Sequence, residues 1–283
     1  MRKDLYFLWG SLTVVLTTYL FVSAPVPLAE KNAFSAEKSD IEISVVFDIV
    51  NLINAKTRQL YTKEIVIAGK KEGLKFDEHW KDEGVEAGPL PALFLREVSS
   101  NLKKRKSSLA LFLGSDKPIA KSNEFKGDML ARIIAMREGP GPQYFTMEKL
   151  GQEIGMYPDF ASANGCVTCH NEHPNSPKVD WKLNDIMGAT TWTYPKSTVS
   201  ISEMRAVIAD VYHSIEISYA AYLADTVQFS RPVAIGKSWP SSGTYSLPST
   251  EVFMAVVHNL TGPDVIKVSY GNPKDRLSLP QPQ

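Results

Sequence analysis

Two cysteines, Cys166 and Cys169, and the histidine that follows them, His170, constrain this chain more than any other feature. They are the only cysteines in 283 residues, so no disulfide framework can hold the fold together. Thiols at this spacing reach the two vinyl groups on one edge of a haem, and the adjacent imidazole is then placed under the iron. The motif therefore predicts one covalent c-type haem, attached through Cys166 and Cys169, with His170 as the proximal iron ligand.

Two other kinds of site use a similar cysteine pair. A thioredoxin-like redox motif begins a helix directly after a strand, whereas we expect an irregular segment around Cys166. A zinc site would need two more ligands, and His173 and one distant histidine are the available candidates. The sequence therefore favours haem over both alternatives.

The N-terminus predicts the compartment. Arg2 and Lys3 precede a stretch from Leu5 to Val22 that contains no charged residue. As a helix this stretch is about 27 Å long, close to the ~30 Å hydrocarbon core of a bilayer. The basic start places the N-terminus in the cytoplasm, so we expect residues 5–22 to cross the cytoplasmic membrane once and the bulk of the chain to lie in the periplasm.

A cleaved signal peptide is the alternative for the same segment. Val22, Ser23 and Ala24 resemble a cleavage site, but Pro25 follows them directly and should hinder the peptidase. We therefore expect an uncleaved anchor, and the interpretation of residues 1–24 as anchor or signal stays open. Either interpretation exports the remaining residues, and c-type haem is attached on that side of the membrane.

Composition limits the function classes. Hydrophobic residues make up 43% of the chain and charged residues 22%, so most of the exported part should fold around a real core. The formal net charge is zero, which argues against a nucleic-acid-binding protein that works through bulk charge. No nucleophile and base pair, phosphate loop or paired carboxylates at credible spacing is visible, so we do not expect an enzyme.

Periodicity predicts an α+β fold, an antiparallel sheet with flanking helices. After a linker at 25–39 we expect the principal domain at 40–195, an amphipathic helix at 196–225, and a loop, terminal hairpin and disordered tail at 226–283. The expected helices cover residues 40–66, 91–104, 123–137 and 199–224. The expected strands cover residues 108–113, 143–150 and 187–194, and the terminal hairpin covers residues 251–260 and 264–270.

The segment from Cys166 to Gly188 resembles the signature of the exported haem-c-binding PAS-like domains. These domains stand alone in cyanobacteria and precede histidine kinases, cyclases or chemotaxis-type receptors in other bacteria. Residues 53–62, 90–94 and 115–118 are similar to further parts of that family, so the resemblance covers about residues 40–195. It implies a PAS-like sheet with the haem at one side, and a role in sensing redox state or a ligand.

The resemblance also leaves the distal side of the iron open. In at least part of that family a cysteine ligates the iron opposite the histidine, but here both cysteines are used for attachment. The remaining candidates are a water, an open position, or one of these side chains: Met129, Met136, Met147, Met156, His79, His173 and His213. Axial ligation is decided by the folded pocket, so spacing does not choose among them.

Three further residues are assigned to the pocket. Arg58 and Tyr61 resemble family positions that face the haem, where they would hydrogen-bond a distal ligand or a propionate. An ordinary amphipathic helix with a solvated Arg58 is the alternative. Trp181, near the motif, is expected to pack on the haem or on the core.

Two functions follow from these features. The first is a membrane-anchored sensor, in which the haem responds to redox state or a gaseous ligand and the chain signals to a separate partner. The second is a c-type electron carrier that passes electrons to another exported protein. In both cases we expect the inner membrane and an unidentified exported or membrane protein as partners, no nucleic acid, and leave a homodimer open.

Overall fold

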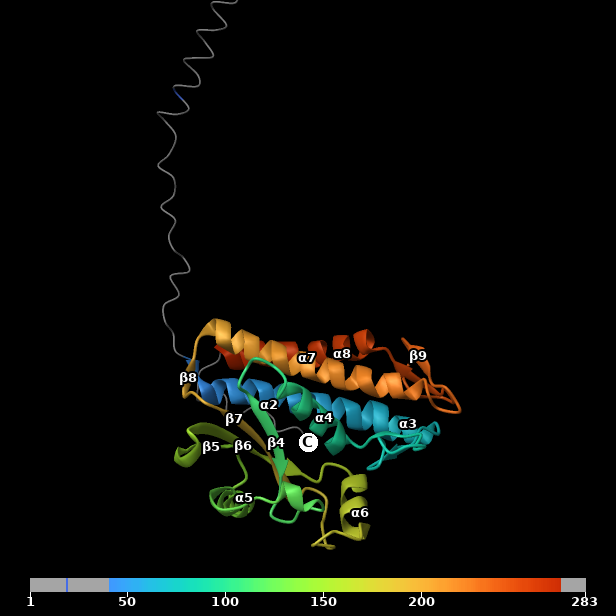
Figure 1. Ribbon diagram of the computed structural model, residues 1–283, viewed down its shortest axis with the longest axis horizontal. Coiled ribbons are helices and arrows are strands. Elements are labelled where there is room, and N and C mark those ends of the chain that lie inside the picture. The colour runs from blue at the N-terminus through green and yellow to red at the C-terminus, as the bar shows by residue number, and fades with distance from the viewer. Residues whose placement is uncertain (1–18, 20–40, 271–283) are drawn as a thin grey trace, which may run out of the picture. The chain divides into compact units, whose positions relative to one another are not determined.

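The computed structural model describes residue 19 and residues 41–270 (Figure 1). Its centre is an antiparallel sheet with the strand order β4-β7-β6-β5, so β7 and β6 are the inner strands. The strands are β4 (Ala110–Gly114), β5 (Gln143–Met147), β6 (Gln152–Phe160) and β7 (Ile186–Tyr194). The expected strands at 108–113, 143–150 and 187–194 are thereby confirmed within a few residues, as is the α+β class.

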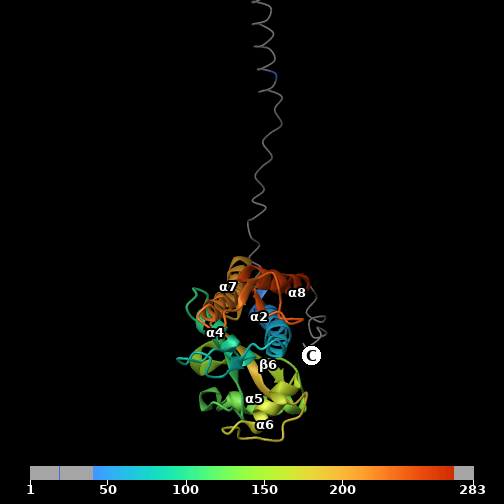
Figure 2. The same ribbon diagram turned by 90° about the vertical axis from the view of Figure 1, so that its right-hand side faces the viewer.

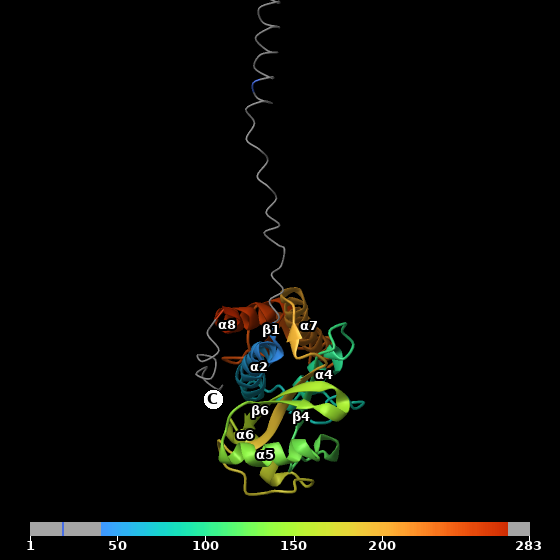
Figure 3. The same cartoon turned by 90° about the vertical axis from the view of Figure 1, so that its left-hand side faces the viewer.

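Helices cover both faces of this sheet. The helices are α2 (Ile43–Leu60) and α4 (Pro91–Leu102) on one face, α5 (Asp128–Glu138) on the other, and α7 (Ile201–Thr226) and α8 (Thr250–Tyr270) outside α2 and α4. Figures 2 and 3 show the same layering from the two sides. Because α7 and α8 pack on α2, this helix is enclosed between the sheet and a second helical layer.

Helix α2 does not end at Leu60. The chain continues through a π-helical segment, η1 (Tyr61–Ile67), into α3 (Ala68–Lys71). The predicted helix at 40–66 is confirmed and extends a few residues further. The predicted helices at 91–104, 123–137 and 199–224 correspond to α4, α5 and α7.

The remaining elements are short. Three strand pairs lie outside the main sheet: β1 (Ile41–Glu42) with β8 (Thr198–Val199), β2 (Phe76–Asp77) with β3 (Gly88–Pro89), and β9 (Ala234–Gly236) with β10 (Ser246–Pro248). Two 3-10 turns, η2 (Lys121–Asn123) and η3 (Glu148–Leu150), and one helix, α6 (Asn164–Glu172), complete the described chain.

The main core lies between the sheet and the helices α2, α4, α7 and α8. Its centre is aromatic: Tyr61 stacks on Phe94 with ring centroids 4.3 Å apart, and Tyr219 stacks on Phe253 at 4.1 Å. All four of these side chains are fully buried. A smaller core on the other face of the sheet joins α5 to β6 and β7.

The strand β6 was missed, because the stretch after Leu150 was expected to be irregular. Its pattern does not alternate, and Pro158 argues against a central strand. The pairing explains the exception: β5 begins at Gln143, opposite Met156, so β6 has no partner on that side at Pro158, where a missing N–H is tolerated. Gly155 is also required, because a Cβ there would lie 2.7 Å from the ring of Phe47.

The predicted terminal hairpin is wrong, since residues 250–270 form the single helix α8 with Pro263 inside it. Thr261, Gly262 and Pro263 resemble a turn in the sequence. In the fold, Phe253, Val257 and Thr261 are buried at helical spacing against the neighbouring helices. Burial of this face outweighs the cost of a proline in the helix.

The predicted anchor and tail fall outside the description. Residues 5–22 are not described except for Tyr19, and neither is the tail from Asn272. Within residues 41–270, no helix combines the length and apolar character that a membrane span requires.

Candidate haem-attachment site

The three motif residues lie on one short helix, α6. The prediction of an irregular segment here is wrong, since residues Asn164–Glu172 are helical. Cys166 and Cys169 are one turn apart and His170 is four residues after Cys166, so the three side chains project from neighbouring positions of one helix face. Both cysteines are free thiols, with Cys166 half-buried and Cys169 exposed.

Helix α6 rests on a small apolar cluster. Ala161, Trp181 and Met187 are buried together, and Cys166 and Val167 pack against them. The expected packing of Trp181 on the core is thus observed, directly beneath the motif. This cluster is separate from both larger cores, so α6 has its own support.

Asn171 ties the end of α6 to the segment that carries Trp181. Its side-chain amide donates to the carbonyl of Trp181 at 3.0 Å and accepts from the N–H of Trp181 at 2.8 Å. These reciprocal hydrogen bonds satisfy both main-chain groups of Trp181. They hold the helix against its apolar cluster without using any of the three motif side chains.

The new helix removes one argument against a redox dithiol. Because α6 begins shortly after β6 ends, the strand and helix order that we associated with a thioredoxin-like motif is present. Partial burial and the nearby carboxylate of Glu78 raise the pKa of Cys169, the second thiol of the pair. The histidine that directly follows this thiol is the feature that favours haem attachment over a redox dithiol.

The environment of His170 suits a metal ligand. Partial burial lowers the pKa of its imidazole. The nearby carboxylate of Asp159 acts in the opposite direction and offsets only part of this effect. The ring is therefore neutral at pH 7, the form that binds metal. Its Nδ1 atom is buried and has no hydrogen-bond partner among the described residues.

These observations fit a covalently attached haem. Two free thiols one turn apart supply the attachment points, and a neutral imidazole with an unsatisfied ring nitrogen supplies an iron ligand. A haem bound here would be held by Cys166, Cys169 and His170. Within residues 41–270, no three His, Cys, Asp or Glu side chains gather as an ordinary metal-ion site.

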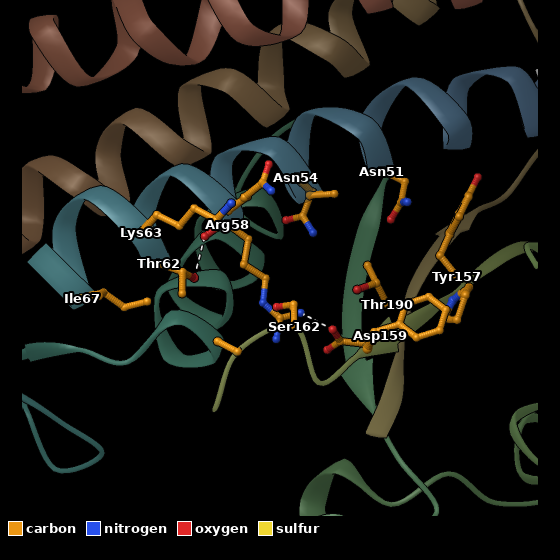
Figure 4. A pocket seen from close by; sticks show the side chains of 15 residues that line it. Asn51, Asn54, Arg58, Thr62, Lys63, Ile67, Tyr157, Asp159, Ser162 and Thr190 are labelled. Atoms are coloured by element: carbon orange, nitrogen blue, oxygen red, sulfur yellow. Dashed lines mark hydrogen bonds and ion pairs between the residues drawn. The ribbon is translucent and has the colours of Figure 1, made fainter. Parts of the chain in front are cut away.

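A polar cavity adjoins the beginning of α6. Its volume is about 110 Å³, below the range of about 300–1,000 Å³ of drug-sized ligand sites, so it has room for a small group only. It lies between α2 with η1 and the end of β6, and Ser162 and Ala163 just before α6 line it (Figure 4). The motif residues themselves do not line this cavity, which therefore lies beside them.

The ion pair of Arg58 with Asp159 crosses the cavity. The Arg58 guanidinium donates to Asp159 at 2.5 Å, and both side chains are three-quarters buried (Figure 4). Burial acts to lower the pKa of Arg58, but the charge and hydrogen bond of Asp159 outweigh it and raise the pKa overall. Arg58 also lies within electrostatic range of Cys166 and His170. Arg58 is thus fixed beside the motif, and it is not the solvated side chain of the alternative interpretation.

Tyr61 lies elsewhere. Its side chain is fully buried in the aromatic core, where its hydroxyl donates to the carbonyl of Pro89 at 2.8 Å. It does not line the cavity, so the structure does not bring it together with Arg58. Arg58 faces the sheet, where it pairs with Asp159, whereas Tyr61 faces α4, where it stacks on Phe94.

The methionine candidates for the distal position lie outside the cluster that supports α6. Met129, Met136 and Met156 belong to the small core beside α5, on the other face of the sheet from α2. Met147 ends β5 opposite Gln152. It is therefore roughly 25 Å along β6 from the end that leads to α6, at about 3.3 Å per residue.

The histidine candidates divide into two groups. His213 lies on α7, paired with Glu216, and Figure 1 shows α7 on the opposite side of the molecule from α6. His173 follows α6, and its Nε2 lies 3.2 Å from a carboxylate oxygen of the neighbouring Glu78. The Oε1 atom of Glu78 also lies 3.6 Å from Nε2 of His79. His79 and His173 are therefore the two candidates on the α6 side. His258, which was not a candidate, lies on α8 with its ring tilted against that of Tyr212 at 4.3 Å between centroids.

Sequence analysis missed Asp159, Asn54 and Asn171 at this site. Asp159 reaches Arg58 only because β6 runs beneath α2, and no local sequence pattern predicts that pairing. Asn171 directly follows His170, so its place in the motif segment was visible even though its partner was not. Asn54 belongs to a polar stripe on α2, at helical spacing from Asn51 and Arg58, and this stripe was the available signal.

The comparisons with known proteins agree with the motif. Residues 33–195, more than half of the chain, match the family model described as Tll0287-like. The matched range contains α2, the cavity and α6, whereas α7 and α8 follow it. No curated protein and no solved structure matches the chain. The chain therefore belongs to the Tll0287-like family, the family of the cyanobacterial c-type haem PAS-like proteins.

Proposed function

We propose that the chain is a monohaem c-type protein, with haem attached through Cys166 and Cys169 and ligated by His170. The observation that carries the proposal is the arrangement on α6, where two free thiols one turn apart precede a half-buried, neutral imidazole. The haem supplies an iron that exchanges electrons or binds a small ligand. The chain's own residues bind and orient it, with the Trp181 cluster behind the helix and Arg58 at the side.

We further propose that the haem domain is a PAS-like sensor of redox state or of a gaseous ligand. The four-stranded antiparallel sheet, with α2 across one face and the motif helix at its side, supports this fold assignment. The long helical run from α2 to α3 passes the cavity and carries Arg58, so a change at the haem would act on this run. A separate partner protein would receive the signal.

An electron carrier is the second candidate, and the exposure of Cys169 favours it. A haem bound at an exposed thiol presents an edge to solvent, where a partner can approach for electron transfer. The same chain would then need no bistable element, because the haem would only change oxidation state. Export of residues 25–283 and anchoring by residues 5–22 belong to both proposals, and the N-terminal sequence supports them.

Haem attachment is tested with the full chain, N-terminal segment included, produced in bacteria that assemble c-type cytochromes. We expect haem to stay with the polypeptide on a denaturing gel and to give the pyridine haemochrome spectrum of thioether-bound haem. Cys166→Ala and Cys169→Ala should each weaken attachment, and together they should abolish it. Thr168→Ala, an exposed position between the cysteines, is the matched control. A folded chain that carries no covalent haem under these conditions would refute the proposal.

Carbon monoxide separates the two candidate functions. A sensor of gaseous ligands should bind CO to the ferrous iron, with a shift of the Soret band. An electron carrier with two protein ligands should keep its ferrous absorption spectrum unchanged under CO. A ferrous protein that does not bind CO and exchanges electrons rapidly with respiratory proteins would exclude gas sensing and favour the electron carrier.

A further inference from the structure

The cavity beside α6 is rich in hydrogen-bond donors. Arg58 has five N–H groups in a planar fork, and its ion pair with Asp159 uses one of them. Lys63, which also lines the cavity, adds a second cation. Asp159 supplies the only carboxylate in the described lining, so the lining carries one net positive charge.

Asn54 adds an unsatisfied polar group that is almost completely buried. Its exposed fraction is 3%, and its Oδ1 atom has no hydrogen-bond partner among the described residues. Figure 4 shows its amide directed from α2 into the cavity, toward the side where Arg58 also points. The oxygen and nitrogen of such an amide are interchangeable in assignment, so in either orientation a polar atom lacks a partner. A buried polar group without a partner is destabilising unless something binds to it.

We propose that this cavity is a binding site for a carboxylate. A monovalent anion balances the net charge of the lining, and the planar guanidinium of Arg58 matches the two oxygens of a carboxylate. The amide of Asn54 supplies the second polar contact from the same helix, one turn earlier. Two sources have this chemistry: a propionate of the chain's own haem, and a free small carboxylate from solution.

The first source rests on the proposed haem attachment, whereas the second does not. In both, Arg58 stays paired with Asp159 and uses its remaining N–H groups for the ligand. The site therefore needs no movement of β6.

The test uses propanoate ion as the probe, because it is the free form of the haem side chain. Calorimetric titration in low-chloride buffer at pH 7 is applied to the haem-loaded full chain and to the Cys166→Ala/Cys169→Ala full chain. Binding by the haem-loaded chain indicates a site for a free carboxylate. Binding by the double variant alone indicates that a haem propionate normally occupies the site. Haem staining measures attachment independently, so failure of the haem proposal remains distinguishable.

Variants of the lining decide whether any binding belongs to this cavity. Arg58→Gln and Asn54→Leu should each weaken propanoate binding at least tenfold. Lys56→Gln, on the same helix but outside the cavity, should leave it unchanged. If the double variant does not fold, the propionate bending band in the resonance Raman spectrum of the haem-loaded chain replaces it, and Arg58→Gln should shift this band. The proposal is overturned if neither chain binds propanoate and the band does not move, or if Arg58→Gln binds as tightly as the unsubstituted chain.

Discussion

The motif helix and the helical layer around α2 are held in place by different means. Helix α6 rests on a cluster of three buried side chains and on the two hydrogen bonds of Asn171. The layer of α2, α4, α7 and α8 shares one large aromatic and aliphatic core. The residues proposed to attach the haem therefore have fewer supporting contacts, while helices outside the family match supply much of the core. A covalently attached haem would add packing contacts at α6, where the polypeptide itself provides few.

The largest effect is expected in the helical layer. Phe94→Ala removes a fully buried ring that stacks on Tyr61 and contacts Phe253 edge-on. We expect the free energy of unfolding to fall by about 3–5 kcal/mol, because the substitution leaves a cavity in a close-packed core. Denaturant unfolding measures this, with the half-exposed Ile134→Ala on α5 as control. A loss below about 1 kcal/mol would mean that this layer is not the principal core.

A smaller and local effect is expected at α6. Asn171→Ala removes both side-chain hydrogen bonds to the main chain of Trp181 and should cost about 2 kcal/mol. Because the support of α6 is separate, the loss should appear as faster hydrogen exchange in α6, with little change in α2. Asn259→Ala, at an exposed position of α8, is the matched control. Equal acceleration in both helices would show that the two regions unfold together.

Tyr61→Phe tests the boundary between the regions. The substitution deletes the hydroxyl that donates to the carbonyl of Pro89 and keeps the ring. We expect a loss of roughly 1–2 kcal/mol in unfolding free energy, because the buried carbonyl loses its partner. The haem absorption spectrum should not change, since Tyr61 does not face the cavity. A displaced Soret band would place Tyr61 in the haem pocket after all.

The smallest effect concerns an ion pair on the α5 side. Arg137 donates two hydrogen bonds to the Asp116 carboxylate, at 2.6 and 2.7 Å. Burial alone would raise the pKa of Asp116, but Arg137 outweighs it and the pKa lies below its ordinary value.

This depressed pKa gives the pH dependence its sign. The stabilisation is fully present above the unfolded pKa of about 3.9 and is lost as the pH falls through the folded value. Asp116→Asn should therefore cost up to about 1 kcal/mol at pH 7 and progressively less below pH 4. Unfolding measured at both pH values checks this, and a cost that grows toward low pH would contradict it.

Local pattern predicted a large part of the fold. The helices near 40–66, 91–104, 123–137 and 199–224 follow from apolar spacing, because each buries one face against a neighbour. The errors fall where tertiary contacts override local preference. Helix α8 contains a proline that suggested a turn, and β6 contains a proline that argued against a strand, but burial and pairing decided both. Helix α6 was missed because its nine residues carry almost no apolar periodicity.

The grouping of the three motif residues was predicted, and their surroundings were not. The sequence by itself determined that Cys166, Cys169 and His170 lie close together, because residues three and four apart are neighbours on a helix. Only the tertiary structure decided that Asp159 holds Arg58, that Asn54 faces a cavity and that Tyr61 turns into the core. Those contacts join segments up to 101 residues apart, as Arg58 and Asp159 are. They depend on how α2 crosses β6, which packing of the whole core fixes and no local pattern encodes.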